Sequence, residues 1–133
     1  MTEQAARLSG ACEGCGRPGV GWAVQLVMGG RLRWETEWAC DVCGIAHDGG
    51  WGPSPAHVRE AIVGQHGLHR LRPRDDEVRG AGVLKAFRDA FGLSLREARE
   101  AADSLRAGGY EGTYVETRLL SDLLHGQAKG DQE

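Results

Sequence analysis

Two short segments share one cysteine pattern: "ACEGCG", residues 11–16, and its near-copy "ACDVCG", residues 39–44. Each holds two cysteines at C-x-x-C spacing followed by a glycine. Two residues between the cysteines let a tight turn aim both thiolates at one ion, and the glycine tolerates the backbone angles of that turn. Two such turns make a closed tetrahedral site that suits Zn²⁺ and leaves no position for water or substrate. We therefore expect one structural zinc ion per chain, held by Cys12, Cys15, Cys40 and Cys43.

Two disulfides are the alternative use of the same cysteines. The N-terminal stretch "MTEQAARLSG" lacks the basic start and apolar run of a secretion signal, which indicates a cytoplasmic, reducing environment and favours zinc. His47 lies four residues after Cys43 and could replace a cysteine. Since four thiols are already paired by their spacing, we expect His47 at the surface or beside the ligands.

Two alternating runs between the cysteine pairs predict a β-hairpin. In the second run, apolar residues and a threonine on one face alternate with charged residues on the other, the period of a half-buried strand. Gly29 and Gly30 separate the runs and can supply the positive φ angles of a two-residue turn. The hairpin carries three tryptophans, which we expect to pack in the core, although aromatic rings of this kind can also stack on nucleic-acid bases. They are Trp22, Trp34 and Trp38.

Residues 10–50 resemble the zinc ribbon family, in which two cysteine turns clamp a β-sheet. A helix is expected to follow, because Ser54 can cap it, Pro55 suits its first turn and Gly67 can end it. The next residues, "LHRLRPRDDEVRGAG", carry basic and acidic groups around a proline, which is typical of a solvated linker. We therefore place a zinc-ribbon domain with its helix at 10–66 and a linker at 67–81.

The C-terminal part, residues 82–126, has the pattern of three helices. The first ends at Gly92, a residue suited to a left-handed helix end. Ser94 with Glu97, and Thr113 with Glu116, have the S/T-x-x-E spacing of a capping box and so predict where the second and third helices begin. The predicted fold class is accordingly α+β, a small β-hairpin domain with four cysteines and a helix, followed by a three-helix module.

The segment "VLKAFRDAFGLSLREARE" resembles the helical hairpin in the C-terminal domain of the bacterial ribosomal stalk protein. That family has an aliphatic-Lys-x-x-Arg run, a Gly-Leu-Gly-Leu turn and a Lys-Glu-Ala-Lys helix start. Here Ser94 replaces the second glycine of the turn, and arginines replace the lysines of the helix start. The likeness spans about residues 80–126, while the dimerisation region of the stalk protein is replaced by the zinc module. The matching residues in the run are Leu84, Lys85 and Arg88.

The stalk domain recruits translational GTPases through its first helix and the basic end of its second. The resemblance therefore implies a protein-docking surface at Leu84, Lys85, Arg88 and Arg99, and a partner in the translation machinery, the ribosome or a translational GTPase. Charge pairs at i and i+4, such as Arg96 with Glu100, are also common on a merely solvated helix face, so both readings of these charges stay open.

Composition narrows the function classes. The net charge of −3 is mild and the basic residues are spread along the chain, which argues against a dominant phosphate-binding surface. No apolar run is long enough to span a bilayer, so no membrane partner is expected. The chain lacks a phosphate loop and the H-x-E signature of zinc deaminases, and we expect no enzyme activity. The sequence predicts a zinc-binding adaptor; the alternative is a nucleic-acid-binding transcriptional regulator that uses the zinc ribbon or a helix-turn-helix.

Overall fold

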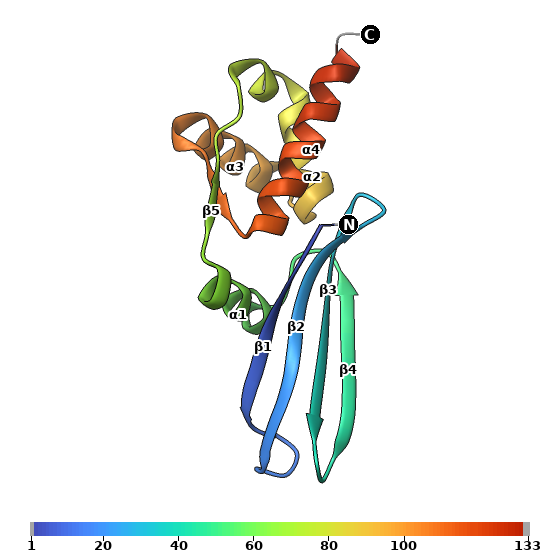
Figure 1. The fold of residues 1–133 in the computed structure, drawn as a ribbon. Helices are drawn as coiled ribbons and strands as arrows, with labels where there is room; N and C mark the ends of the chain where they lie inside the picture. Colours follow the sequence, from blue (N-terminus) through green and yellow to red (C-terminus); the bar gives the residue numbers. More distant parts are fainter. Residues whose placement is uncertain (1, 132–133) are drawn as a thin grey trace.

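The computed structural model describes residues 2–131 and has an α+β fold, in which a four-stranded antiparallel sheet accompanies four α-helices (Figure 1). The fold class predicted from the sequence is confirmed at this level. The expected hairpin forms the two central strands, whereas the two outer strands were not predicted. In chain order, which is also their order in the sheet, the strands are β1 (Glu3–Ala11), β2 (Pro18–Met28), β3 (Arg31–Cys40) and β4 (Gly44–Trp51).

The central hairpin turns at the two glycines that the sequence indicated. Gly29 and Gly30 have φ angles of 59° and 75°, and Met28 pairs with Arg31 as the last rung of the ladder. Only glycine adopts two successive positive φ angles without steric cost, and this geometry matches the twist of the strands. The prediction of a two-residue turn is confirmed.

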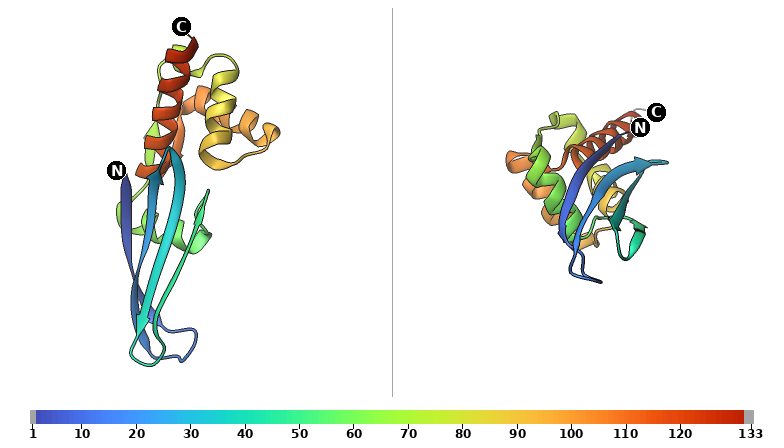
Figure 2. Two further views of the ribbon diagram at one scale, coloured as in Figure 1. Left: turned by 90° about the vertical axis from the view of Figure 1, so that its right-hand side faces the viewer. Right: turned by 60° about the horizontal axis from the view of Figure 1, so that its bottom comes forward.

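The two faces of the sheet differ in what covers them. The inner face packs against α1 (Ala56–His66), whose Val58 and Ile62 are fully buried. The outer face points away from α1, and the right-hand view of Figure 2 shows α1 on one side of the strands only. On β2 the inner side chains are small or amide-bearing and the outer ones are apolar. The inner set is Gly19, Gly21, Ala23, Gln25 and Val27, and the outer set is Val20, Trp22, Val24, Leu26 and Met28.

The expectation that Trp22 packs in the core is wrong, because Trp22 lies on the outer face and is 50% exposed. Trp34 and Trp38 are half-buried on the inner face. The small residues of β2 and β4 make room for them: a Cβ added at Gly19 would lie 2.4 Å from the Trp38 ring, and one at Gly50 would lie 2.9 Å from Trp34 Nε1. Because α1 covers the face that carries the small residues, it lies close to the strands, and Trp22 remains on the uncovered outer face.

Helix α1 is present where the sequence predicted it and ends before Gly67, but its expected cap is wrong. Pro55 occupies the N-cap position, and Ser54 Oγ instead accepts a hydrogen bond from Gln25 on β2. The helix also shields the edge of β1. Gln65 donates to the Arg7 carbonyl and accepts from the Arg7 N–H, at 2.7 and 3.0 Å, and these bonds leave that part of the edge without free backbone groups.

The C-terminal half forms what we call the helical module, residues 69–131. It contains the short strands β5 (His69–Leu71) and β6 (Tyr110–Gly112), which pair with each other, a 3₁₀ turn η1 (Asp75–Val78), and the helices α2 (Ala81–Phe91), α3 (Leu95–Gly108) and α4 (Tyr114–Asp131). The segment 67–81, for which the sequence indicated a solvated linker, thus includes a paired strand. No helix in the part of the chain that the structure describes is long and apolar enough to cross a membrane.

Local signals placed the end of α2 and the starts of α3 and α4 correctly, whereas α4 continues to Asp131, beyond the end at residue 126 that the sequence indicated. Gly92 follows α2 in the left-handed conformation, with φ 65° and ψ 27°. The Ser94 side chain accepts from the Glu97 N–H while the Glu97 carboxylate accepts from the Ser94 N–H, which is the predicted capping box. Thr113 and Glu116 make the same reciprocal pair at the start of α4.

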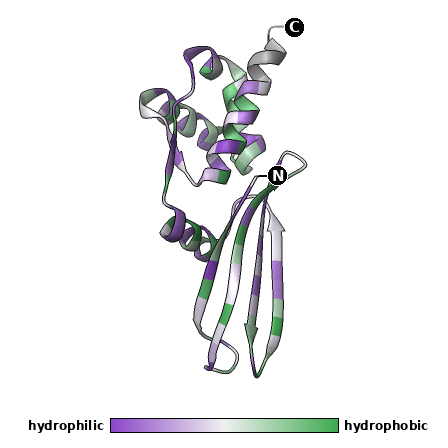
Figure 3. Cartoon of the chain, in the orientation of Figure 1, coloured by the Kyte–Doolittle hydropathy of each residue, from purple (hydrophilic) through white to green (hydrophobic). Residues whose placement is uncertain are grey.

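The sheet and the helical module share one hydrophobic core. Phe87 of α2, fully buried, lies at its centre, with the Tyr110 ring 5.4 Å away, and Leu32 of β3 belongs to the same buried cluster. Apolar residues along α2 and α4 are visible as green segments among polar ones in Figure 3. The two halves of the chain are therefore held together by apolar packing as well as by the polar contacts described below.

We expect Phe87→Ala to lower the free energy of unfolding by about 3–5 kcal/mol, because it removes a large buried ring and leaves a cavity. Leu95→Ala is the matched control, since Leu95 is 45% exposed and its truncation costs far less. Chemical denaturation of both variants measures the difference. Equal effects of the two substitutions would contradict this description of the core.

Candidate metal centre

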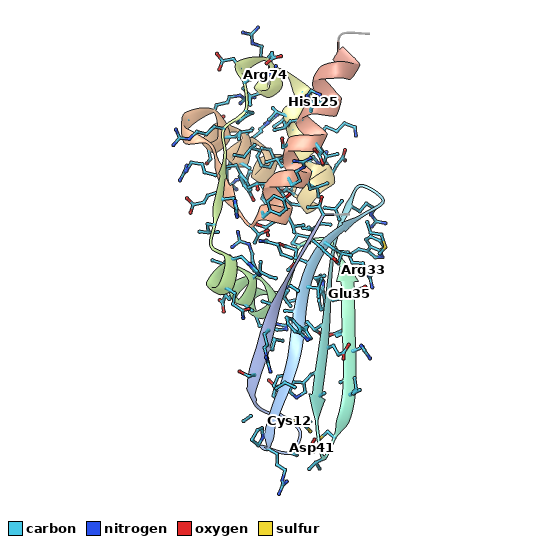
Figure 4. All side chains as sticks on the ribbon, viewed as in Figure 1. Cys12, Arg33, Glu35, Asp41, Arg74 and His125 are labelled. Atoms are coloured by element: carbon cyan, nitrogen blue, oxygen red, sulfur yellow. The ribbon has the colours of Figure 1, made fainter. Side chains whose placement is uncertain are left out.

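The four cysteines come from two neighbouring connections at one end of the sheet. Cys12 and Cys15 lie between β1 and β2, while Cys40 ends β3 and Cys43 lies in the turn before β4. Because β2 and β3 are adjacent, with Gly19 opposite Cys40, the two connections meet. Figure 4 labels Cys12 and Asp41 at this end, which is remote from the helical module and which we call the cysteine end.

The geometry of the sulfur atoms suits a tetrahedral ion. All four Sγ atoms lie within 4.8 Å of one another, with 4.0 Å between Cys12 and Cys43 and 3.6 Å between Cys15 and Cys40. A tetrahedron with Zn–S bonds of about 2.3 Å has sulfur atoms about 3.8 Å apart, whereas a disulfide needs about 2.0 Å. The cysteines are free thiols in the structure. The predicted ligands are thus brought together as a set that could hold a metal ion such as zinc.

Backbone geometry explains why the two cysteines of each C-x-x-C pair can point their Sγ atoms toward one common centre. The Cys43 N–H donates to Cys40 Sγ at 3.1 Å, and the Gly16 N–H donates to the Cys12 carbonyl at 2.7 Å. Gly16 and Gly44, the glycines after each pair, have φ angles of 74° and 82°. These are the positive angles that the sequence pattern predicted, and they return the chain to the next strand. A Cβ at Gly14 would lie 3.2 Å from Cys43 Sγ, so a side chain there would crowd the sulfurs.

The thiols have unequal acidity because they share one small site. Hydrogen bonds from the Trp38 indole and the Gly14 N–H lower the pKa of Cys12 to about 6. Hydrogen bonds with Cys40, Cys15 and Cys12 raise the pKa of Cys43 to about 12. One thiolate is therefore favoured without a metal, and a divalent cation would displace the remaining protons. The sequence had favoured core packing for Trp38, with base stacking as the alternative, and did not predict its contact with Cys12.

His47 is not part of this cluster. It lies in the middle of β4, where it pairs with Glu37 of β3, and its Nδ1 is 3.8 Å from the Glu37 carboxylate. Its side chain is 70% exposed. The cysteines alone form the candidate ligand set within residues 2–131.

The residues expected to dock a partner lie elsewhere, on the helical module. Leu84, Lys85 and Arg88 line one side of a groove of about 460 Å³ between α2 and the start of α3, and Leu93 and Leu95 line the other. Lys85 forms an ion pair of 2.6 Å with Asp89, and Arg88 Nε donates to the Leu93 carbonyl at 3.4 Å. Arg99, the fourth residue implied by the stalk resemblance, is exposed on α3 outside the groove lining.

A buried polar junction joins the sheet, α1 and α4, and sequence reasoning missed it. Gln25 of β2 is fully buried and donates to Ser54 Oγ and to a Glu116 carboxylate oxygen, at 3.1 and 3.0 Å. Its own carbonyl oxygen accepts from the Thr113 hydroxyl. Arg59 of α1 completes the set with two hydrogen bonds of 3.0 Å to Glu116. Gln25 and Glu116 are 91 residues apart, so no local pattern could pair them.

Electrostatics keep Glu116 ionised in this junction. Burial alone raises the pKa of a carboxyl, but Arg59, the Thr113 N–H and Gln25 outweigh burial and hold the pKa of Glu116 below its usual range. Glu116 therefore stabilises the fold above its unfolded-state pKa, and that contribution is lost as the pH falls through the lower folded-state pKa.

Comparisons of the chain with protein-family models, with curated proteins and with solved structures give no match.

We expect the purified protein to contain one zinc ion per chain, and Cys40→Ser to lose most of it, because three thiolates leave the tetrahedral set open. His47→Ala is the control and should keep its full metal content. Elemental analysis after dialysis measures both. Metal loss in His47→Ala, or a metal-free folded protein with two disulfides, would show that the ligand set is wrong.

Glu116→Gln should lower the free energy of unfolding by about 1–3 kcal/mol at neutral pH, because a buried charge-assisted pair is lost. The difference from the unmodified protein should shrink as the pH falls below about 4, since Glu116 itself then becomes neutral. Denaturation curves at several pH values measure it. Glu111→Gln, which removes an exposed ion pair with Arg70, is the control. A difference that grows with acidity would contradict the assignment.

Proposed function

We propose that the chain is a non-enzymatic, cytoplasmic zinc-binding adaptor that docks a protein of the translation machinery, the ribosome or a translational GTPase, through the groove between α2 and α3. The observation that carries the proposal is the composition of this groove. Three of the four residues implied by the resemblance to the ribosomal stalk protein line it together, Leu84, Lys85 and Arg88. They would present an apolar surface beside two cationic groups.

The groove has the chemistry of a site for an amphipathic acidic segment. Leu84, Leu93 and Leu95 supply apolar contacts, and Leu95 is 45% exposed although it begins a packed helix. Lys85 and Arg88 stand on the rim, with only Asp89 to balance them among the lining residues. An acidic partner would replace the weak exposed pair between Lys85 and Asp89, and charges of this kind mainly set association rate and partner choice.

The metal would have a structural role in this proposal. Four thiolates complete the coordination of Zn²⁺, so no position remains for a water molecule or a substrate. The ion would hold the cysteine end in shape, some distance from the groove that docks the partner. A metal that only stabilises the cysteine end, with a separate groove for the partner, supports an adaptor and argues against metal-assisted catalysis at the cysteines.

The second candidate is nucleic-acid binding, which the exposure of Trp22 favours because an exposed indole can stack on a base. Arg7 lies beside Trp22 on β1, but nearby acidic groups argue against nucleic-acid binding. Glu37 lies beside Trp22 on β3, and on the helix-turn-helix alternative Arg96 is paired with Glu100 at 3.4 Å. Acidic groups at these positions would meet phosphates unfavourably. We therefore prefer the protein partner.

We expect the double variant Lys85→Glu/Arg88→Glu to lose binding to purified ribosomes or translational GTPases, while the fold stays intact because exposed charges add little to stability. Fluorescence anisotropy of the labelled protein over a salt series measures binding. The control is Arg118→Glu, which breaks a similar exposed i, i+4 pair, with Asp122 on α4, and should bind normally.

Duplex DNA and RNA in the same assay test the second candidate. Binding to nucleic acid that falls steeply with salt and that Lys85→Glu/Arg88→Glu leaves unchanged would favour it. Absence of binding to ribosomes and GTPases by the unmodified chain, or equal binding by the double variant, would overturn the docking proposal.

A further inference from the structure

The outer face of the sheet carries an apolar stripe that the described part of the chain covers only in part. The five successive outward side chains of β2 from Val20 to Met28 are apolar, while the residues of β2 and β3 that meet helices, such as Gln25 and Leu32, belong to the inner face. Val20 is 48% exposed, Trp22 50% and Met28 39%, whereas Val24 is half-buried and Leu26 is buried, with 4% exposed. A sheet face that meets water normally carries polar residues, and an uncovered apolar stripe marks an interface. The stripe consists of Val20, Trp22, Val24, Leu26 and Met28.

Charges of opposite sign stand on either side of the stripe. At one level of the ladder Arg7 of β1 and Glu37 of β3 flank Trp22. Four residues further along β2, Glu3 of β1 and Arg33 of β3 flank Leu26, so the signs of the two flanking charges are reversed. At these two levels, the outward charge on β1 is therefore opposite in sign to the outward charge on β3. We call the outward side chains of each strand the β1 row and the β3 row.

Part of this charge has no partner within the molecule. Among the residues that the structure describes, no ion pair involves the side chains of Arg7 and Glu3, which are both exposed. Glu37 has only the exposed His47 at 3.8 Å. Arg33 is paired with Glu35 and lies over the Trp51 ring at 4.9 Å. Beside its apolar stripe, the outer face thus carries charged side chains that have no ion-pair partner among the described residues.

This pattern fits a second copy of the same chain, and we propose that two copies pack outer face on outer face, related by a two-fold axis that runs parallel to the strands over β2. The axis places the β1 row of one copy opposite the β3 row of the other. Arg7 then faces Glu37 of the second copy, Glu3 faces Arg33, and Trp22 packs against Trp22. Each of the two ion pairs occurs twice, as two-fold symmetry requires, and the Trp22 contact lies on the axis.

The dimer is an aligned β-sandwich, with the two sheets about 10 Å apart and inclined by about 30°. An axis across the strands is less favourable, because it places Glu35 opposite Glu35 when Val24 lies on Val24. With the axis along the strands, Glu35 instead faces the small side chain of Ala5. The groove between α2 and α3 and the cysteine cluster contribute no residue to this interface, so both stay accessible in each copy.

Sedimentation velocity of the zinc-loaded full chain tests the proposal over protein concentrations from about 1 to about 100 μM, a range that includes weak interfaces. We expect a monomer–dimer equilibrium. Arg7→Glu and Glu37→Arg should each weaken it at least about tenfold, because like charges then face each other across the interface. The double variant Arg7→Glu/Glu37→Arg should restore it to within a few-fold, since each altered charge again meets its opposite.

Two further variants separate this interface from others. Trp22→Ser should abolish dimerisation and leave the melting temperature of the monomer almost unchanged, because the side chain is half exposed. Arg96→Glu on α3 is a charge reversal away from the sheet and should have no effect. A protein that stays monomeric throughout the range, a dimer that tolerates both single reversals, or a double variant that is not restored would each overturn the proposal.

Discussion

Four thiol groups close the cysteine end, and the sheet depends on them to hold its four strands together there. Away from the helical module the strands have little to hold them, since β4 is exposed along nearly its whole length and α1 reaches only β1 and β2. The buried side chains at that end are those of Cys12 and Cys40. A metal ion there would join all four strands through two turns, and its binding free energy would become folding free energy.

The opposite end is held by a different kind of interaction. Gln25, Arg59 and Glu116 bring the sheet, α1 and α4 together through hydrogen bonds, and none of their buried side-chain nitrogen and oxygen atoms lacks a partner. Around them, Phe87 and its neighbours supply apolar packing. A fully satisfied buried network of this kind adds geometric specificity to a core whose apolar contacts alone are less directional. A metal ion at the cysteine end and the polar junction at the opposite end would thus each hold one end of the same sheet.

The features that the sequence predicted correctly are those whose cause is local. The C-x-x-C pairs, the Gly29–Gly30 turn and the capping box at Ser94 each depend on residues close together in the chain, and the structure contains all three. The meeting of the two cysteine pairs also followed, because one hairpin connects them. Leu84, Lys85, Arg88 and Arg99 were singled out through a family resemblance; the first three line one groove that the sequence did not predict, whereas Arg99 lies outside it.

What the sequence did not predict depends on contacts between distant residues. Alternation in β2 separates two faces, but it does not say which one a helix will cover, and the larger side chains, Trp22 among them, suggested the wrong one. Strand β5 is three residues long and exists through its pairing with β6, about 40 residues later. The glycine-rich β4 has little intrinsic strand preference and pairs because the cysteine turn places it beside β3.

X-ray absorption at the zinc edge of the purified protein reports directly on the atoms that bind the metal. We expect a single shell of four sulfur atoms at about 2.3 Å, without nitrogen or oxygen ligands. A mixed shell with fewer than four sulfurs, or protein without bound metal whose cysteines are oxidised in pairs, would contradict this expectation.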